Sequence, residues 1–196
     1  MEMRKTEAIR SSFKVRTDEP RIEGYFAVFG QNYELWPGAT ESIDPHAFDG
    51  CLNDDIRCLV DHDTRLVLGR TKARTLTLRV DSHGLWGSVL INKNDLDAMN
   101  IYQRVKRGDV NQCSFGFEIL DEAVNKKPNG EIHWTIKKVK LYEVSCVTFP
   151  AYTGTSIEAR KKDLAKNDLN AWKNEMKRRL QAAHKKLERR PSKCRY

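Results

Sequence analysis

A serine, a histidine and a glutamate lie in or beside apolar segments of this chain. Side chains of these types can form a hydroxyl nucleophile, its general base and the group that orients the base. Ser114 belongs to an alternating segment, residues 112–119, and lies opposite a face of Cys, Phe and Ile side chains. His62 and Glu143 each lie toward the end of another apolar segment. A serine, a histidine and a carboxylate together can attack a carbonyl group. Because geometry and not chain order assigns such roles, the sequence raises the hypothesis of a catalytic triad.

Each of these residues also has a structural interpretation, which the residues alone leave open. A serine on a strand is most often a surface polar residue. His62 shares a predicted strand face with apolar residues, as a buried structural histidine would. Glu143 could instead pair with a lysine of a neighbouring strand, such as Lys137 or Lys138.

The acidic residues on either side of His62 form a poor metal site. Asp61 and Asp63 are expected to project to the other face of a straight strand, so the three neighbours cannot converge on one ion. Three further histidines are alternatives to His62, in a short predicted helix, a hairpin turn and a polar strand: His46, His83 and His133.

The elements that would hold the candidate residues are mostly short strands. Alternation and β-branched or aromatic content predict strands at residues 11–16, 22–29, 41–43, 56–62, 67–71, 75–80, 85–91, 112–119, 132–138 and 141–149. A loop is expected at residues 30–37, a short helix from Asp44 to about Gly50, and a longer helix at residues 92–110 that Asn94 caps and Gly108 ends. This spacing favours a mainly β (α+β) fold, a closed or nearly closed antiparallel β-barrel with flanking helices.

Charge divides the chain into two parts. The 196 residues carry a net charge of +8, but 14 Lys or Arg and only 4 Asp or Glu lie from Ala159 onward. We therefore expect a flexible N-terminus (1–10), a β-barrel domain (11–158) and a basic amphipathic helical tail (159–196). Such a tail is either a solvated helix, a nucleic-acid contact or a contact with another protein. Its one aromatic residue within the helix, Trp172, offers no stacking pattern for single strands.

Composition excludes some classes of protein. No apolar run approaches the ~20 residues of a membrane span, and no apolar stretch follows the first residues as in a secretory signal. The five cysteines are scattered and form no CxxC motif, which favours a cytosolic protein with reduced thiols.

Several blocks, in their joint order and spacing, resemble the tailed-bacteriophage prohead proteases, serine peptidases of procapsid maturation that are related to the herpesvirus assembly protease. The blocks are GYFAVF at 24–29, ESIDPHAF at 41–48, LVDHD at 59–63, LGRT at 68–71, TLTL at 75–78 with residues 81–85, SFGF at 114–117 and EVSCVTFPAY at 143–152. They extend along most of residues 12–160.

The resemblance implies a compact barrel and a division of roles among the candidate residues. His62 would be the general base and Ser114 the nucleophile, and Glu143 is assigned as the third member, with Asp63 and Asp61 as alternatives. Backbone N–H groups near Gly116 or the guanidinium of Arg70 are expected as donors to the oxyanion. No metal or cofactor is needed for this chemistry.

The partners implied by the resemblance are proteins of the capsid interior. The expected substrates are a scaffolding protein or the scaffold-like segment of the major capsid protein, and the protease itself, with a dimer as a further possibility. The expected place is the procapsid interior in the host cytoplasm, with no membrane contact. We expect the tail to pack against scaffold helices and self-cleavage near residues 155–165 to release it. The alternatives are a catalytically inactive assembly module and, less favoured, a nucleic-acid binder.

Overall fold

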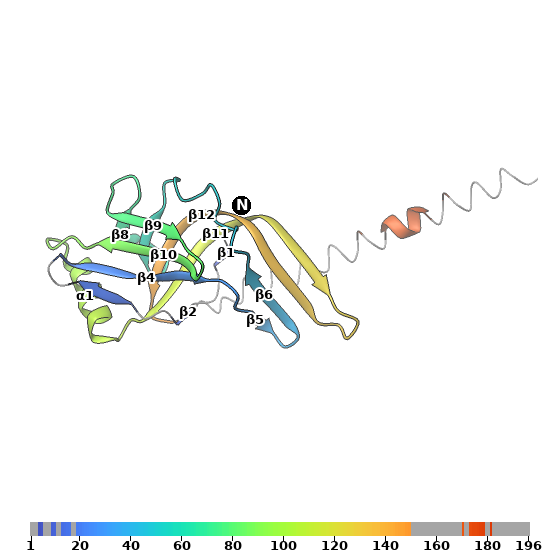
Figure 1. Cartoon of the computed structure of the whole chain (residues 1–196), viewed down its shortest axis with the longest axis horizontal. Coiled ribbons are helices and arrows are strands. Elements are labelled where there is room, and N and C mark those ends of the chain that lie inside the picture. Colours follow the sequence, from blue (N-terminus) through green and yellow to red (C-terminus); the bar gives the residue numbers. More distant parts are fainter. Residues whose placement is uncertain are drawn as a thin grey trace, which may run out of the picture. The chain divides into compact units, whose positions relative to one another are not determined.

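The computed structural model describes residues 4–5, 9–10, 13–16, 19–149, 170, 173–178 and 181. Contacts divide the chain into two units, residues 1–153 and residues 154–196. In the second unit, residues 173–178 are helical (Figure 1). The expected cleavage segment at 155–165 and most of the tail's apolar stripe lie outside the described residues.

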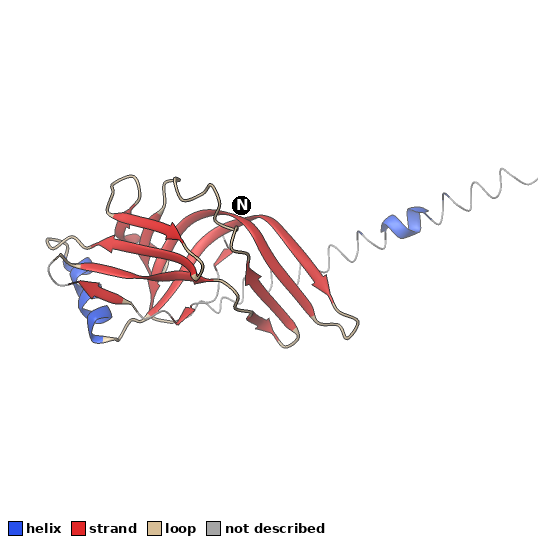
Figure 2. Ribbon diagram, in the orientation of Figure 1, coloured by secondary structure: helices blue, strands red, loops and turns tan. Residues whose placement is uncertain are grey.

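The first unit is mainly β (Figure 2). Its larger sheet contains β1 (Arg4–Lys5), β2 (Ile9–Arg10), β5 (Tyr33–Trp36), β6 (Ala39–Ile43), β7 (Arg57–Val60), β8 (Asp63–Arg70), β11 (Gln112–Lys126) and β12 (Ile132–Val147). Its smaller sheet has the order β3 (Lys14–Arg16), β4 (Arg21–Val28), β10 (Gly84–Leu90) and β9 (Leu76–Val80). The helix α1 (Leu96–Arg107) connects β10 to β11.

Two long strands form the centre of the larger sheet. β11 and β12 pair antiparallel along nearly their whole length and run side by side to the tip of their hairpin (Figure 1). The other edge of β12 pairs in parallel with β6 near its start and with β7 near its end, and β8 then pairs with β7. The strands predicted at 132–138 and 141–149 are thus one strand with register shifts.

The predicted closed or nearly closed antiparallel barrel is not confirmed. The described strands form two sheets, and the larger one contains two parallel pairings. The spacing of strands along a sequence indicates that the strands exist but does not identify which strands pair. The pairing that would close a barrel could therefore not be predicted from this spacing.

Both sheets contribute side chains to the hydrophobic core. Phe26 and Leu85 of the smaller sheet belong to one buried cluster with Phe115 and Val144 of the larger sheet. The alternation predicted for β11 is confirmed, because its Cys and Phe side chains lie in this cluster. The intervening positions, including Ser114, therefore lie on the sheet face that points away from the core.

The two predicted helices have different outcomes. The longer one exists as α1 but starts later, because Asp95 and not Asn94 accepts the Ala98 N–H at 3.1 Å. Gly108 ends it in the left-handed conformation, as predicted. The short helix predicted from Asp44 is wrong, since residues 45–50 form successive turns, and a segment this short does not nucleate a helix easily.

One smaller difference concerns a loop. The loop predicted at residues 30–37 contains β5, which pairs with β6. Among the helices that the structure describes, none has the length and apolar character needed to span a bilayer.

Candidate active site

His62 and Glu143 contact each other directly although 81 positions separate them in the sequence. His62 Nδ1 lies 2.7 Å from Glu143 Oε1, and the two side chains are only 6% and 4% exposed. An ionised carboxylate can only accept, so Nδ1–H then donates to it. This tautomer leaves Nε2 as the accepting nitrogen of the ring, which is the state that a general base requires.

A tight turn, and not a strand, positions His62. β7 ends at Val60, which pairs with Asp63 at the start of β8, so that Asp61 and His62 form a two-residue hairpin loop. Both loop residues have positive φ, 46° and 61°, as the two central residues of a type I′ turn do. The prediction that His62 continues the strand and shares the face of Val60 is therefore wrong. The turn instead directs its imidazole to Glu143.

Backbone and side-chain contacts hold this turn in its uncommon conformation. The Asp61 N–H donates to the Cys146 carbonyl at 2.9 Å. The Asp61 carboxylate accepts the Thr148 N–H at 2.7 Å and the Thr148 hydroxyl at 3.2 Å. Since non-glycine residues seldom adopt positive φ, these contacts to the end of β12 offset the cost of placing His62 there.

The three carboxylates considered as the third member have different partners. Asp61 binds Thr148, and Asp63 binds Arg65, whose hydrogen bonds lower the pKa of Asp63 to about 2. Of the three, only Glu143 hydrogen-bonds to His62. The expectation that Asp61 and Asp63 project to one face of a straight strand is also wrong, because Asp61 lies in the turn and Asp63 begins β8.

Ser145 and Gly116, neither of which was predicted to contact Glu143, determine the surroundings of its carboxylate. The Ser145 hydroxyl donates to Glu143 Oε2 at 2.5 Å. Gly116 lies opposite Glu143 in the β11–β12 pair, and a Cβ there would overlap the carboxylate. The available signal for Ser145 was its position two residues after Glu143, which places both on one strand face.

Ser114 lies on the same sheet face, next to this pair. It is the register partner of Ser145, so it is a diagonal neighbour of Glu143, about 7–8 Å away between Cα atoms. Ser114 is fully buried. His62 Nε2 is buried without a hydrogen-bond partner, so no hydrogen bond joins it to the Ser114 hydroxyl in this structure. An unpaired buried nitrogen costs about 1–3 kcal/mol, a cost that functional sites often carry.

A cleft of about 560 Å³ borders the turn that carries His62. Asp61 and Thr148 line it together with side chains of β8 and α1, and the remaining lining residues are Val60, Asp95, Asp109 and Val110. His62, Ser114 and Glu143 do not line it.

Arg70 is held away from Ser114. Asp55 accepts hydrogen bonds from Arg70 Nε at 2.6 Å and Nη2 at 2.5 Å. β8 lies three strands from β11, about 14 Å at the usual strand spacing. This arrangement does not favour Arg70 as a donor to an oxyanion at Ser114.

The three histidines considered as alternatives to His62 lie apart from the serine and carboxylate candidates. His46 is 82% exposed, and His83 lies in a hairpin turn. The ring of His133 lies between the hydroxyls of Thr40 and Ser42. In the described part of the chain, no three His, Cys, Asp or Glu side chains are grouped so that they could hold a metal ion.

Comparison with known families decides the class of protein. A family model described as caudovirus prohead serine protease matches residues 8–169. The chain belongs to this family. It is therefore a prohead protease, a hydrolase of the capsid maturation class. The matched region contains His62, Ser114 and Glu143.

Searches of curated proteins and of solved structures gave no match. The relation to the herpesvirus assembly protease, which the sequence resemblance implied, stays a prediction.

Proposed function

We propose that this prohead protease cleaves peptide bonds through Ser114 as nucleophile and His62 as general base, with Glu143 as the group that positions His62. The observation that carries the proposal is the buried hydrogen bond between His62 Nδ1 and Glu143 Oε1, on the sheet face that carries Ser114. Family membership supports the serine chemistry, and the geometry supports the choice of residues.

The reaction follows from these positions. His62 Nε2 takes the proton of the Ser114 hydroxyl as Oγ attacks the scissile carbonyl carbon. The tetrahedral intermediate collapses as the C–N bond breaks, and His62 Nε2–H protonates the leaving amine. Water then attacks the acyl-enzyme ester while His62 Nε2 accepts its proton. As the ester C–O bond breaks, His62 returns a proton to Ser114 Oγ, which releases the new carboxyl terminus and restores the serine hydroxyl. Glu143 stabilises the imidazolium formed in both steps.

The active arrangement must differ from this structure in two respects. Ser114 Oγ has to come within hydrogen-bonding distance of His62 Nε2, a contact that often forms only in the substrate complex. The buried Ser114 also has to become accessible to a polypeptide.

The substrates that we propose are polypeptides of the procapsid interior in the host cytoplasm. They are a scaffolding protein or the scaffold-like segment of the major capsid protein, together with the protease itself. Family membership supports partners of this class. The excess of basic residues after position 158 fits a tail that binds an assembly partner.

Intact-mass spectrometry of co-expressed proteins tests this function. The full chain, its Ser114→Ala variant and a Ser88→Ala control are each expressed with the capsid and scaffold proteins. Ser88 is also a buried strand serine, but on β10. We expect discrete truncations of a partner or the protease with the wild type and the control, and none with Ser114→Ala. Full-length masses throughout, despite normal shells, would favour a catalytically inactive assembly module. Identical truncations with Ser114→Ala would point to another protease.

A further inference from the structure

We propose that Arg57 and Arg70 form a subsite that binds an acidic side chain of the polypeptide substrate. This inference rests on the proposed function and adds a substrate preference to it.

The register places both arginines in line with the candidate active site. Gly116 on β11 pairs with Glu143 on β12, Glu143 pairs with Arg57 on β7, and Arg57 pairs with Arg70 on β8. Register partners on neighbouring strands share a sheet face. Arg57 on β7 and Arg70 on β8 therefore lie on the same sheet face as Glu143 and Ser114.

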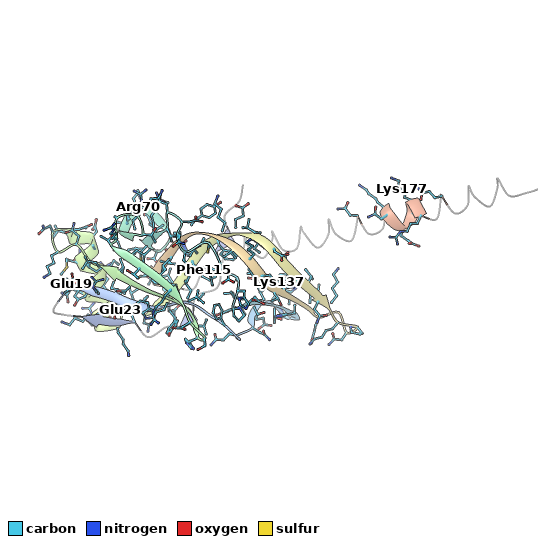
Figure 3. All side chains as sticks on the ribbon, turned by 45° about the horizontal axis from the view of Figure 1, so that its top comes forward. Glu19, Glu23, Arg70, Phe115, Lys137 and Lys177 are labelled. Atoms are coloured by element: carbon cyan, nitrogen blue, oxygen red, sulfur yellow. The ribbon has the colours of Figure 1, made fainter. Side chains whose placement is uncertain are left out.

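Among these register partners, the exposed fraction of the side chain increases from β12 to β7 and β8. Glu143 is buried, whereas the Arg57 and Arg70 side chains are 42% and 43% exposed. Figure 3 shows nitrogen-bearing side chains around Arg70 that point away from the ribbon. A substrate that reaches Ser114 along this face would meet the two guanidinium groups at the solvent side.

Positive charge is in excess at this place. Asp55 is the carboxylate that both arginines share, at 3.1 Å from Arg57 Nη2 and 2.5 Å from Arg70 Nη2. Hydrogen bonding from Arg70 is the main cause that lowers the pKa of Asp55 to about 2, and the charges of Arg57, Arg70 and Lys72 act in the same direction. Two arginines thus share one carboxylate, and Lys72 adds a third positive charge to the surroundings of Asp55. Each guanidinium has five N–H donors, so both arginines retain donors for a second carboxylate.

The distance from Ser114 predicts where the acidic residue lies in the substrate. β7 and β8 lie two and three strands from β11, about 10 and 14 Å at the usual strand spacing. An extended peptide advances about 3.3 Å per residue. The bound acidic side chain should therefore lie about three or four residues from the cleaved bond.

Cleavage of a peptide library by the full chain tests the proposal. The library consists of synthetic tetradecapeptides with randomised positions, and mass spectrometry identifies the cleaved bonds. We expect Asp or Glu to be enriched three or four residues from the bond. Replacement of that acid by Gln in a single selected peptide should lower kcat/KM on the order of tenfold.

Variants assign the preference to the two arginines. Arg57→Gln/Arg70→Gln should lose the enrichment, and Arg57→Glu/Arg70→Glu should shift it to Lys or Arg, which a purely structural role would not produce. Arg65→Gln is the matched control, because Arg65 also pairs with an aspartate on β8. An unchanged acid preference in the Gln variant, or cleavage by the wild type without such a preference, would overturn this inference alone. If neither the library nor the co-expressed capsid proteins were cleaved, the proposed function would fail and this inference with it.

Discussion

Glu143 lies directly opposite Gly116 in the β11–β12 pair, and its carboxylate occupies the space that a side chain at position 116 would fill. The absence of a side chain on one strand thus permits a buried carboxylate on the next. His62 Nδ1 and the Ser145 hydroxyl then hold one oxygen each. The position of His62 therefore depends on residues of three different strands or turns.

Replacement of Gly116 should displace the Glu143 carboxylate. We expect Gly116→Ala to lower the cleavage rate by about 10- to 100-fold, because an error of about 1 Å in a catalytic geometry has this effect. A double-mutant cycle with Glu143→Gln is the control. If Gly116 acts through Glu143, adding Gly116→Ala to the Glu143→Gln variant should cost little further activity. Additive losses would show that Gly116 acts in another way.

Loss of the Ser145 hydroxyl should affect stability and activity together. Ser145→Ala removes a buried hydrogen bond to Glu143 Oε2, which should cost about 1 kcal/mol of unfolding free energy. We also expect a loss of activity on the order of tenfold, since the carboxylate that holds His62 is less restrained. Ser88→Ala removes a comparable hydrogen bond, to Glu23, and should lower stability without lowering activity. Equal activity in the two variants would argue against a role of Ser145 in the site.

Among substitutions that keep the shape of the replaced side chain, Glu143→Gln should lower activity the most. A glutamine can present its NH₂ group to His62 Nδ1, which favours the tautomer with the proton on Nε2 and leaves no base for Ser114. We expect kcat/KM to fall by about 10³- to 10⁴-fold with an unchanged thermal transition. Asp61→Asn and Asp63→Asn are the comparison variants, because these residues were the other candidates for the third member. A larger loss for either of them than for Glu143→Gln would contradict the assignment.

A buried thiol should make stability depend on alkaline pH. Hydrogen bonding with Cys146 and burial raise the pKa of Cys58 well above its ordinary 9.0. Above about pH 9 the unfolded chain releases this proton and the folded chain keeps it, so the unfolding free energy falls as pH rises. The limiting slope for one proton is about 1.4 kcal/mol per pH unit.

Urea titrations between pH 8 and pH 10.5 measure this effect. Cys58→Ala should start less stable than the wild type, because it leaves a small cavity, but should lack this part of the pH dependence. The difference in unfolding free energy between the two proteins should therefore narrow above pH 9. A constant difference would show that the folded protein does not protect the Cys58 thiol.

Sequence patterns correctly predicted the local features of the fold, those that a single segment of the chain determines by itself. The alternation in β11 placed Ser114 opposite the core, and Gly108 marked the end of α1. The hairpin of β9 and β10 was also predicted close to its observed bounds. These features depend on strand periodicity and on turn residues with special backbone conformations, which the sequence displays directly.

The features that the sequence did not predict depend on pairing and on uncommon backbone conformations. Asp61 and His62 both have positive φ. Aspartate and histidine adopt this conformation more often than most residues, but a pair without glycine or asparagine is a weak turn signal in a sequence. The parallel pairing of β12 with β7, which aligns Arg57 with Glu143, joins segments far apart in the chain. Sequence alone selected His62, Ser114 and Glu143 through a family resemblance, and the structure adds the hydrogen bond that joins two of them.

The proposed mechanism requires that His62 and Ser114 act as one catalytic unit. The measurement is the cleavage rate of the partner polypeptide by His62→Ala, by Ser114→Ala and by the double variant. Residues of one catalytic unit give strongly non-additive losses, so each single variant should be as slow as the double variant. A double variant that is far slower than either single one, or a Ser114→Ala variant that retains wild-type cleavage, would contradict the proposed mechanism.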